Sequence, residues 1–184
     1  MTSMMAFEDK SNEAVEVPTP GASMEEDAGF LLIALVVSLR SRDPSTQVGA
    51  LVTDACGHIL SSGFNRLSRG LDETSAGYRR DGAWLGTKYP YMLCAELDAL
   101  LSCAGSDLRD HRLYTTLHPC HLCAKAIVEK GIGEVVYLED KYPDKDFRIA
   151  AGRILAAAGV KARRPSVPWS ADVVRALIRA ARRE

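Results

Sequence analysis

The sequence places three cysteines and one glutamate at a spacing that suits a catalytic metal ion. Cys94 and Glu96 are followed further along the chain by Cys120 and Cys123, with Pro119 directly before that pair. Zn²⁺ prefers thiolate or imidazole ligands in a tetrahedron, and a catalytic zinc site keeps one of its four positions for water. The three cysteines would fill the other positions. Metal binding lowers the pKa of that water, so hydroxide becomes available near neutral pH.

Glu96 lies two residues after Cys94, too close in sequence to be an obvious fourth ligand, and suits the role of proton carrier. It would take a proton from the water, protonate the ring nitrogen of an amine-bearing heterocycle and later protonate the leaving amine. Such a carboxyl needs a raised pKa, which partial burial provides. A ligand followed two positions later by Glu, and then P-C-x-x-C, is the signature of zinc-dependent deaminases. The pattern therefore predicts hydrolytic deamination.

Two other interpretations of the C-x-x-C pair stay open at this point. It would also suit a redox pair, or a structural zinc site with Cys56 or Cys103 as its fourth ligand. Neither interpretation requires the proline before the pair or the glutamate near Cys94. The chain has 5 cysteines, an odd number, and no apolar leader at its start, so we expect free thiols and a reducing cytoplasm rather than a disulfide framework.

Segments on both sides of these motifs resemble the deoxycytidylate (dCMP) deaminases of the cytidine deaminase superfamily. They are SRDPSTQVGA (41–50), SGFNR (62–66), TKYPY (87–91), AK (124–125), GIGEVVY (131–137) and DKY (140–142). The resemblance covers residues 28–163. It implies conversion of dCMP and water to dUMP and ammonia, with Zn²⁺ as cofactor. It also implies homo-oligomers, from dimer to hexamer, and dCTP and dTTP as effectors.

Three residues depart from the family's pattern. Cys94 stands where His is usual, although deaminases of free nucleosides use Cys there. Arg66 stands where Gly is common, and Asp98 where Asn is common. The departures leave room for another cytosine substrate: cytidine or deoxycytidine, dCTP, a modified cytosine nucleotide or a nucleoside antibiotic. A catalytically silent zinc domain that regulates a partner is a third alternative, against which the intact Glu96 argues.

Three thiolates on Zn²⁺ leave a formal charge of −1, which works against ionising the bound water. Helix dipoles or a hydrogen-bond donor to the sulfurs would have to offset this charge. His118 and His121 flank Cys120 and are the candidate donors. A solvent-exposed or structurally bonded histidine is the alternative for each of them.

The resemblance also implies the substrate contacts. Asn65 would bind the sugar hydroxyl, with a turn-forming asparagine as the alternative, and the backbone amide of Ala95 would hold the pyrimidine carbonyl. We expect Thr46 and Val48 to wall the base site, and His118 either to stack near the base or to be structural. The phosphate requires Arg or Lys donors. The candidates are Arg42, Arg66, Arg69, Lys88 and Lys141.

Composition narrows the class of partner. A chain of 184 residues suggests one domain. The net charge of −1 gives no support for broad binding to nucleic acid or to an anionic membrane. The apolar run at 29–39 is too short to span a bilayer, which takes about 20 residues, so we expect a buried helix there. A small pyrimidine nucleotide is the expected partner.

The order of elements predicts an α/β fold. We expect a disordered tail over residues 1–24, which are polar and acidic, and one deaminase domain over 25–184. The expected helices are 24–40, 94–104, 120–130, 147–158 and one after Ser170, and the expected strands are 48–53, 58–64, 113–117, 134–138 and 160–163. Such alternation places helices on both faces of a sheet. The resemblance implies the three-layer α-β-α cytidine deaminase fold, with a five-stranded mixed sheet and both ligand-bearing helices on one face.

Overall fold

Helices and strands alternate in the predicted order. The structure is a computed structural model that describes residues 24–71, 77–105 and 107–181. The helices are α1 (Met24–Ser38), α2 (Ala95–Ser102), α3 (His121–Glu129), α4 (Asp146–Ala157) and α5 (Ala171–Ala181). The strands of the main sheet are β1 (Gly49–Thr53), β2 (Ile59–Phe64), β5 (Arg112–Leu117), β6 (Glu134–Glu139) and β7 (Lys161–Arg163). The predicted disordered tail lies outside the described residues, except for Met24, which begins α1.

The main sheet is mixed, as predicted. Its strand order is β2-β1-β5-β6-β7. The β1–β2 and β1–β5 pairs are antiparallel, whereas β5–β6 and β6–β7 are parallel. Gly49 pairs with Phe64, and Leu117 pairs with Glu139. The start of β1 and the ends of β2, β5 and β6 therefore meet at one edge of the sheet, where the candidate site residues follow.

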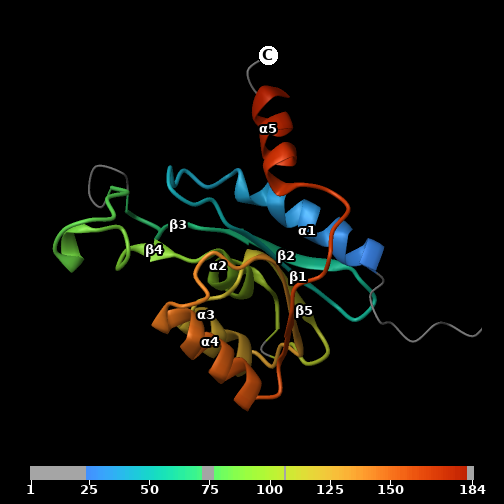
Figure 1. Cartoon of the computed structure of the whole chain (residues 1–184). Coiled ribbons are helices and arrows are strands. Elements are labelled where there is room, and N and C mark those ends of the chain that lie inside the picture. Colours follow the sequence, from blue (N-terminus) through green and yellow to red (C-terminus); the bar gives the residue numbers. More distant parts are fainter. Residues whose placement is uncertain (1–23, 72–76, 106, 182–184) are drawn as a thin grey trace, which may run out of the picture.

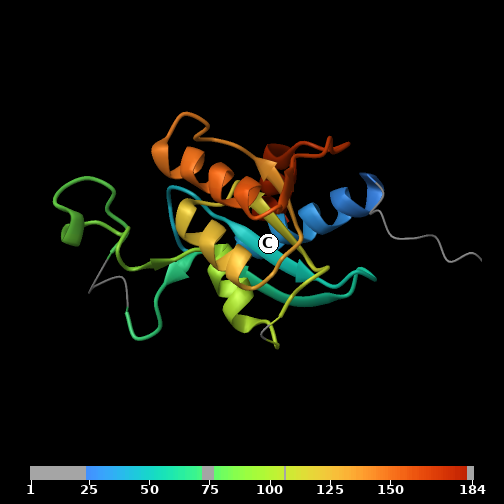
Figure 2. The same cartoon turned by 90° about the horizontal axis from the view of Figure 1, so that it is seen from below.

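Helices cover both faces of this sheet (Figures 1 and 2). Helices α2, α3 and α4 lie on one face, and α1 lies on the other with α5 beyond it. Side chains alternate along β1: Ala50 and Val52 belong to the core under α2 and α3, whereas Leu51 belongs to the core under α1. Both helices that carry the predicted ligands thus share one face, which confirms the three-layer fold.

A second, two-stranded sheet was not predicted. β3 (Arg66–Leu67) pairs antiparallel with β4 (Met92–Leu93), and a short 3-10 helix, Trp84–Gly86, lies in the chain between them. The sequence predicts a long loop over 65–88, because strands of two residues are too short to show periodicity. In this pairing Arg66 lies opposite Leu93. The residues that follow Asn65 are thereby held beside those that precede Cys94.

Charged residues connect α1 to β7, the last strand of the sheet. Arg163 on β7 is paired with both carboxylate oxygens of Asp27, which is 1% exposed, and with Glu134 at the start of β6. The Tyr114 hydroxyl donates to Asp27 at 3.1 Å. The network crosses from α1 to β7, so the last strand belongs to the same folded unit. None of the helices in the described ranges has the length and apolar composition needed to cross a lipid bilayer.

Gly63 allows α2 to lie directly against β2. A Cβ atom at this position would lie 2.3 Å from the Ala99 nitrogen and 2.4 Å from the Ala95 oxygen, which are backbone atoms of α2. Because a helix backbone cannot yield as the end of a flexible side chain can, any side chain here must displace the helix. The position of the helix that bears Glu96 therefore depends on the absence of a side chain at residue 63.

We expect Gly63→Ala to lower the free energy of unfolding by about 1–3 kcal/mol, the usual cost of overpacking. The same variant should lose zinc, because α2 positions Cys94. Gly29→Ala is the matched control: nothing lies within 4 Å of its added Cβ, and it lies in a helix interior. It should raise stability by roughly 0.5–1 kcal/mol. Denaturant unfolding and metal analysis measure both effects; a Gly63→Ala protein as stable as the parent would contradict this packing.

Candidate active site

Three cysteine sulfurs converge at the edge of the sheet. The Sγ atoms of Cys94, Cys120 and Cys123 lie within 4.8 Å of one another, and those of Cys120 and Cys123 are 3.6 Å apart. Zn–S bonds of about 2.3 Å in a tetrahedron separate two sulfurs by about 3.8 Å. The three sulfurs are therefore spaced to hold such an ion with little movement.

A fourth cysteine ligand is missing from this group. In the described part of the chain, no further His, Cys, Asp or Glu joins the three sulfurs in a metal-binding cluster. Cys103 is buried elsewhere in the core, with its sulfur 3.6 Å from the Ala104 carbonyl, and Cys56 is exposed in the turn between β1 and β2. A structural site normally has four protein ligands, so the three-sulfur group matches the catalytic type, which keeps a position for water.

Two helix N-termini point at this group. Cys94 is the N-cap residue of α2 and Cys120 that of α3, and neither helix has a side-chain hydrogen bond at its cap. Cys123 lies in the first turn of α3. The partial positive charge of a helix N-terminus stabilises thiolates. Two helix dipoles thus supply part of the charge compensation that three thiolates require.

The thiols compete with one another for negative charge. Hydrogen bonds from the Cys123 and Cys94 thiols lower the pKa of Cys120 well below the usual thiol range, and the backbone N–H groups of Cys123 and Leu122 add to this. The bond to Cys120 in turn raises the pKa of Cys94 and that of Cys123 well above the usual thiol range. A cation held between the three sulfurs would replace the thiol protons and favour the thiolate form of each.

The two histidines beside Cys120 do not serve as donors to its sulfur. The His118 Nδ1 donates to the Pro119 carbonyl at 2.9 Å, and its ring meets the Tyr137 ring edge-on, with centroids 4.7 Å apart. The His121 Nδ1 is buried without a hydrogen-bond partner. Donors to the Cys120 sulfur include the backbone N–H groups named above. Desolvation lowers the pKa of His118, so its ring is neutral at physiological pH.

Glu96 lies against the metal site from the first turn of α2. Its side chain is 4% exposed, and its Oε2 is 3.6 Å from the Cys123 Sγ. Burial raises the pKa of Glu96 to about 7, and the charge of Cys120 adds to the shift. A carboxyl with such a pKa both accepts and donates protons near neutrality. Ala95, the first residue of α2, is fully buried beside it, and an N–H at that position has no partner within its own helix.

Asn65 lies at the end of β2 and joins two other predicted base-site residues. Its Oδ1 accepts from the Val48 N–H at 2.7 Å, and its Nδ2 donates to the Thr46 carbonyl at 2.9 Å. The Nδ2 also lies 3.4 Å from the Asp43 Oδ2. These bonds use both amide protons and leave one lone pair of Oδ1 for a ligand hydroxyl. Asp43, which organises this loop, is not among the residues predicted from the sequence.

Asp43 forms a buried ion pair with Lys88. Their side chains are 2% and 7% exposed, and Lys88 Nζ is 2.5 Å from Asp43 Oδ2. The Asp43 Oδ1 accepts from the backbone of Ser45 and Thr46. An Asp that turns the chain through its own following N–H groups is a recognisable Asx turn, so D-P-S-T is the signal that would have indicated Asp43.

The predicted phosphate-side residues are spread over separate elements. Arg66 pairs with Asp98, Lys141 with Glu139 at 2.9 Å, and Lys88 with Asp43. Arg42 is exposed in the loop after α1, and Arg69 lines a surface cavity. Arg66 and Arg69 line the same cavity, and the phosphate contacts stay a prediction.

Exchange of one ligand type for another tests the metal site. We expect Cys94→His to retain one zinc per chain, because imidazole is as good a zinc ligand as thiolate and would remove one negative charge. Metal analysis of the purified variant measures the stoichiometry, and Cys94→Ala serves as the comparison that loses the ligand. Zinc content in Cys94→Ala equal to that of the parent would argue against Cys94 as a ligand.

Comparison with known proteins agrees with this geometry. The family described as the cytidine and deoxycytidylate deaminase zinc-binding region matches residues 24–139. The chain is 36% identical over 146 residues to the mouse deoxycytidylate deaminase, covering 79% of this chain and 82% of that protein. It is 39% identical over 144 residues to a probable deoxycytidylate deaminase of Drosophila melanogaster, covering 75% and 71%.

A solved structure extends the likeness to the fold. The crystal structure of the dCMP deaminase from cyanophage S-TIM5 in complex with dCMP and dUMP is similar with a TM-score of 0.61. It is 25% identical, over 78% of this chain and 98% of that one. Family match, sequence identity and fold thus agree with the three-cysteine site: the chain belongs to the zinc-binding cytidine and deoxycytidylate deaminase family.

Proposed function

We propose that the protein catalyses the hydrolytic deamination of dCMP to dUMP, with release of ammonia. The observation that carries the proposal is the buried Glu96, whose carboxylate lies 3.6 Å from one sulfur of a three-cysteine metal site. The names of the mouse and fly relatives, and the dCMP and dUMP in the cyanophage structure, support this nucleotide as substrate.

The residues divide the chemistry between them. Cys94, Cys120 and Cys123 would hold Zn²⁺, which when bound supplies a Lewis acid that makes water nucleophilic near neutral pH. Glu96 accepts a proton from the water that attacks C4 and gives it to the N3 atom of the ring. A C–O bond forms as the ring amidine loses its double bond. Glu96 then moves the remaining hydroxyl proton to the amine, the C4–N bond breaks, and ammonia leaves a C4 carbonyl.

Binding and orientation fall to the neighbouring elements. The backbone N–H of Ala95 would hold the pyrimidine carbonyl, and the remaining lone pair of Asn65 Oδ1 would accept from the sugar hydroxyl. Thr46 and Val48 would wall the base, with the neutral ring of His118 near it. Arg42, Arg66 and Lys141 stay the predicted phosphate contacts. Arg66 and Lys141 would have to exchange a carboxylate partner for the phosphate to do so.

A substrate panel tests the proposal. Zinc-loaded protein is incubated with dCMP, dCTP, deoxycytidine and cytidine, and ammonia release and the change in ultraviolet absorbance are followed. We expect the highest kcat/KM for dCMP. If another compound of the panel gave the highest kcat/KM, that compound would replace dCMP as the assigned substrate and the deamination chemistry would stand. If none of the compounds were converted, the proposed function would be wrong.

We also propose that the protein works as a homo-oligomer. Apolar side chains are exposed on neighbouring helices: Ile33 and Val36 on α1 are 42% and 47% exposed, and Val173 and Leu177 on α5 are 57% and 65% exposed. Exposed apolar surface of this kind favours association. Light scattering after size exclusion measures the oligomeric state.

The substrate panel, repeated in the presence of dCTP and of dTTP, tests these nucleotides as effectors. The free state of all 5 cysteines supports a cytoplasmic location.

A further inference from the structure

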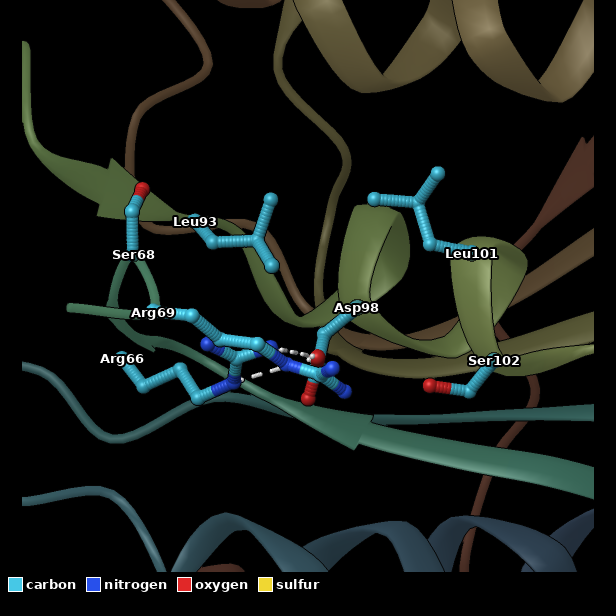
Figure 3. A pocket seen from close by; sticks show the side chains of 7 residues that line it. All are labelled: Arg66, Ser68, Arg69, Leu93, Asp98, Leu101 and Ser102. Carbon is cyan, nitrogen blue, oxygen red and sulfur yellow. Dashed lines mark hydrogen bonds and ion pairs between the residues drawn. The ribbon is translucent and has the colours of Figure 1, made fainter.

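Arg66 and Asp98 form an ion pair beside the candidate site, between β3 and α2. The Nη2 and Nε atoms of Arg66 lie 2.7 and 3.1 Å from the Asp98 Oδ1 (Figure 3). The side chains are 24% and 10% exposed. A carboxylate this buried needs its partner, because an unpaired charge in such a place is costly.

The pair holds the chain on both sides of Asn65. The second oxygen of Asp98, Oδ2, accepts from the Phe64 N–H at 3.2 Å, whereas its Oδ1 accepts from Arg66. Asn65 lies between these two anchors, and its own side chain bonds on the other side to the Val48 and Thr46 backbone. One carboxylate on α2 thus fixes the residue before and the residue after Asn65.

The close approach at Gly63 brings the backbone of β2 into direct contact with the backbone of α2. A Cβ atom on Gly63 would lie 2.8 Å from the Asp98 carbonyl carbon, so the two backbones touch here. Asp98 follows Glu96 by two residues on the same helix. The segment that ends in Asn65 and the helix that carries Glu96 are therefore joined at two neighbouring points.

The pair does not itself contact the metal site. It borders a cavity of about 320 Å³ that Arg69, Leu93 and Leu101 also line, and to which none of the three metal-site sulfurs contributes (Figure 3). A phosphate contact by Arg66 would be the same for nucleotides with and without the sugar hydroxyl. An effect of the pair on discrimination between such nucleotides would therefore pass through the residues that the pair holds.

We propose that Arg66 and Asp98 are positioning residues that set Asn65 relative to Glu96, and through Asn65 set the preference for substrates with a sugar hydroxyl. The inference rests on the proposed function, in which Asn65 accepts from that hydroxyl. It predicts that breaking the pair weakens discrimination between substrates that have and lack the hydroxyl. A pair that only stabilised the fold would not change this ratio.

The test compares kcat/KM for dCMP with that for 2′,3′-dideoxyCMP, which lacks the hydroxyl. Arg66→Ala leaves the Asp98 carboxylate unpaired. We therefore expect the kcat/KM ratio to fall about tenfold, which is within the range of interaction energies measured between residues in direct contact. Adding Asp98→Asn removes the unpaired charge and keeps an oxygen for the Phe64 N–H. The double variant should therefore regain most of the parental kcat/KM ratio.

Asp98→Asn alone is a milder change, which keeps the test possible if Arg66→Ala does not fold. It should lower the kcat/KM ratio about threefold. All variants should keep one zinc.

Glu134→Gln is the matched control. It weakens a comparable, partly buried pair with Arg163 and Arg112 at the opposite end of the sheet, so it should lower Tm and leave the ratio unchanged. An unchanged ratio in Arg66→Ala or Asp98→Asn, with an active and zinc-loaded parent, would overturn this inference alone. Equal activity of the parent on both nucleotides would overturn it together with the role of Asn65. A parent inactive on the whole panel would overturn the proposed function as well.

Discussion

Replacing Glu96 with Gln is expected to lower kcat/KM for dCMP by about 10³- to 10⁴-fold, the upper range for general acid–base catalysis. The large effect follows because one carboxyl serves every proton transfer in the proposed reaction. Gln fills the same buried space but neither accepts nor donates a proton at this pKa. Zinc should stay bound, since the change removes a negative charge beside the sulfurs and no ligand.

Steady-state and single-turnover rates measure the loss, and metal analysis shows whether zinc is retained. Glu129→Gln is the control, because Glu129 is an exposed carboxylate at the end of α3, away from its N-terminus. It should retain parental kcat/KM. If Glu96→Gln behaved like the parent in every assay, the protein would be better described as a zinc domain with a role other than catalysis.

The metal site and the sheet were predictable because their signals are local. Cys120 and Cys123 lie on one helix turn, and Glu96 lies two residues after Cys94, so spacing alone indicates that each pair acts together. The strands of the main sheet alternate with helices of ordinary length, which predicts the layers. The α3 helix ends at Glu129, and Gly131, just after its C-cap Lys130, has a φ of 79°, which suits glycine after a helix C-terminus.

The environment of Asn65 was not predictable in the same way. Its neighbours Asp43 and Lys88 are 45 residues apart in sequence, and Arg66 and Asp98 are 32 apart. Such pairs form only after the strands have brought their segments together, and no periodicity marks them. In the sequence, Arg66 and Asp98 are separate departures from the family's pattern. The structure shows that the two side chains are partners.

Removal of one metal ligand should be as damaging as removal of the proton carrier. We expect Cys123→Ala to weaken zinc binding by about 10²- to 10³-fold. This is the loss expected if each of the four ligands of a structural zinc site contributes equally to its binding free energy. Deaminase activity should disappear with the metal. The sulfur that is lost is fully buried, and the metal-binding cluster of the described residues consists of the three cysteines, so its removal leaves two thiolate ligands. Competition with a chromogenic chelator measures the affinity.

Cys103→Ala separates loss of a ligand from loss of a buried sulfur. Cys103 is 8% exposed and belongs to the same core cluster as Cys123, but its sulfur lies outside the metal site. Its replacement should cost about 1 kcal/mol of stability, as for a small cavity, and should leave zinc content and activity at the parental level. If Cys103→Ala lost zinc as fully as Cys123→Ala, core packing rather than ligation would explain both results, and the three-sulfur site would have to be abandoned.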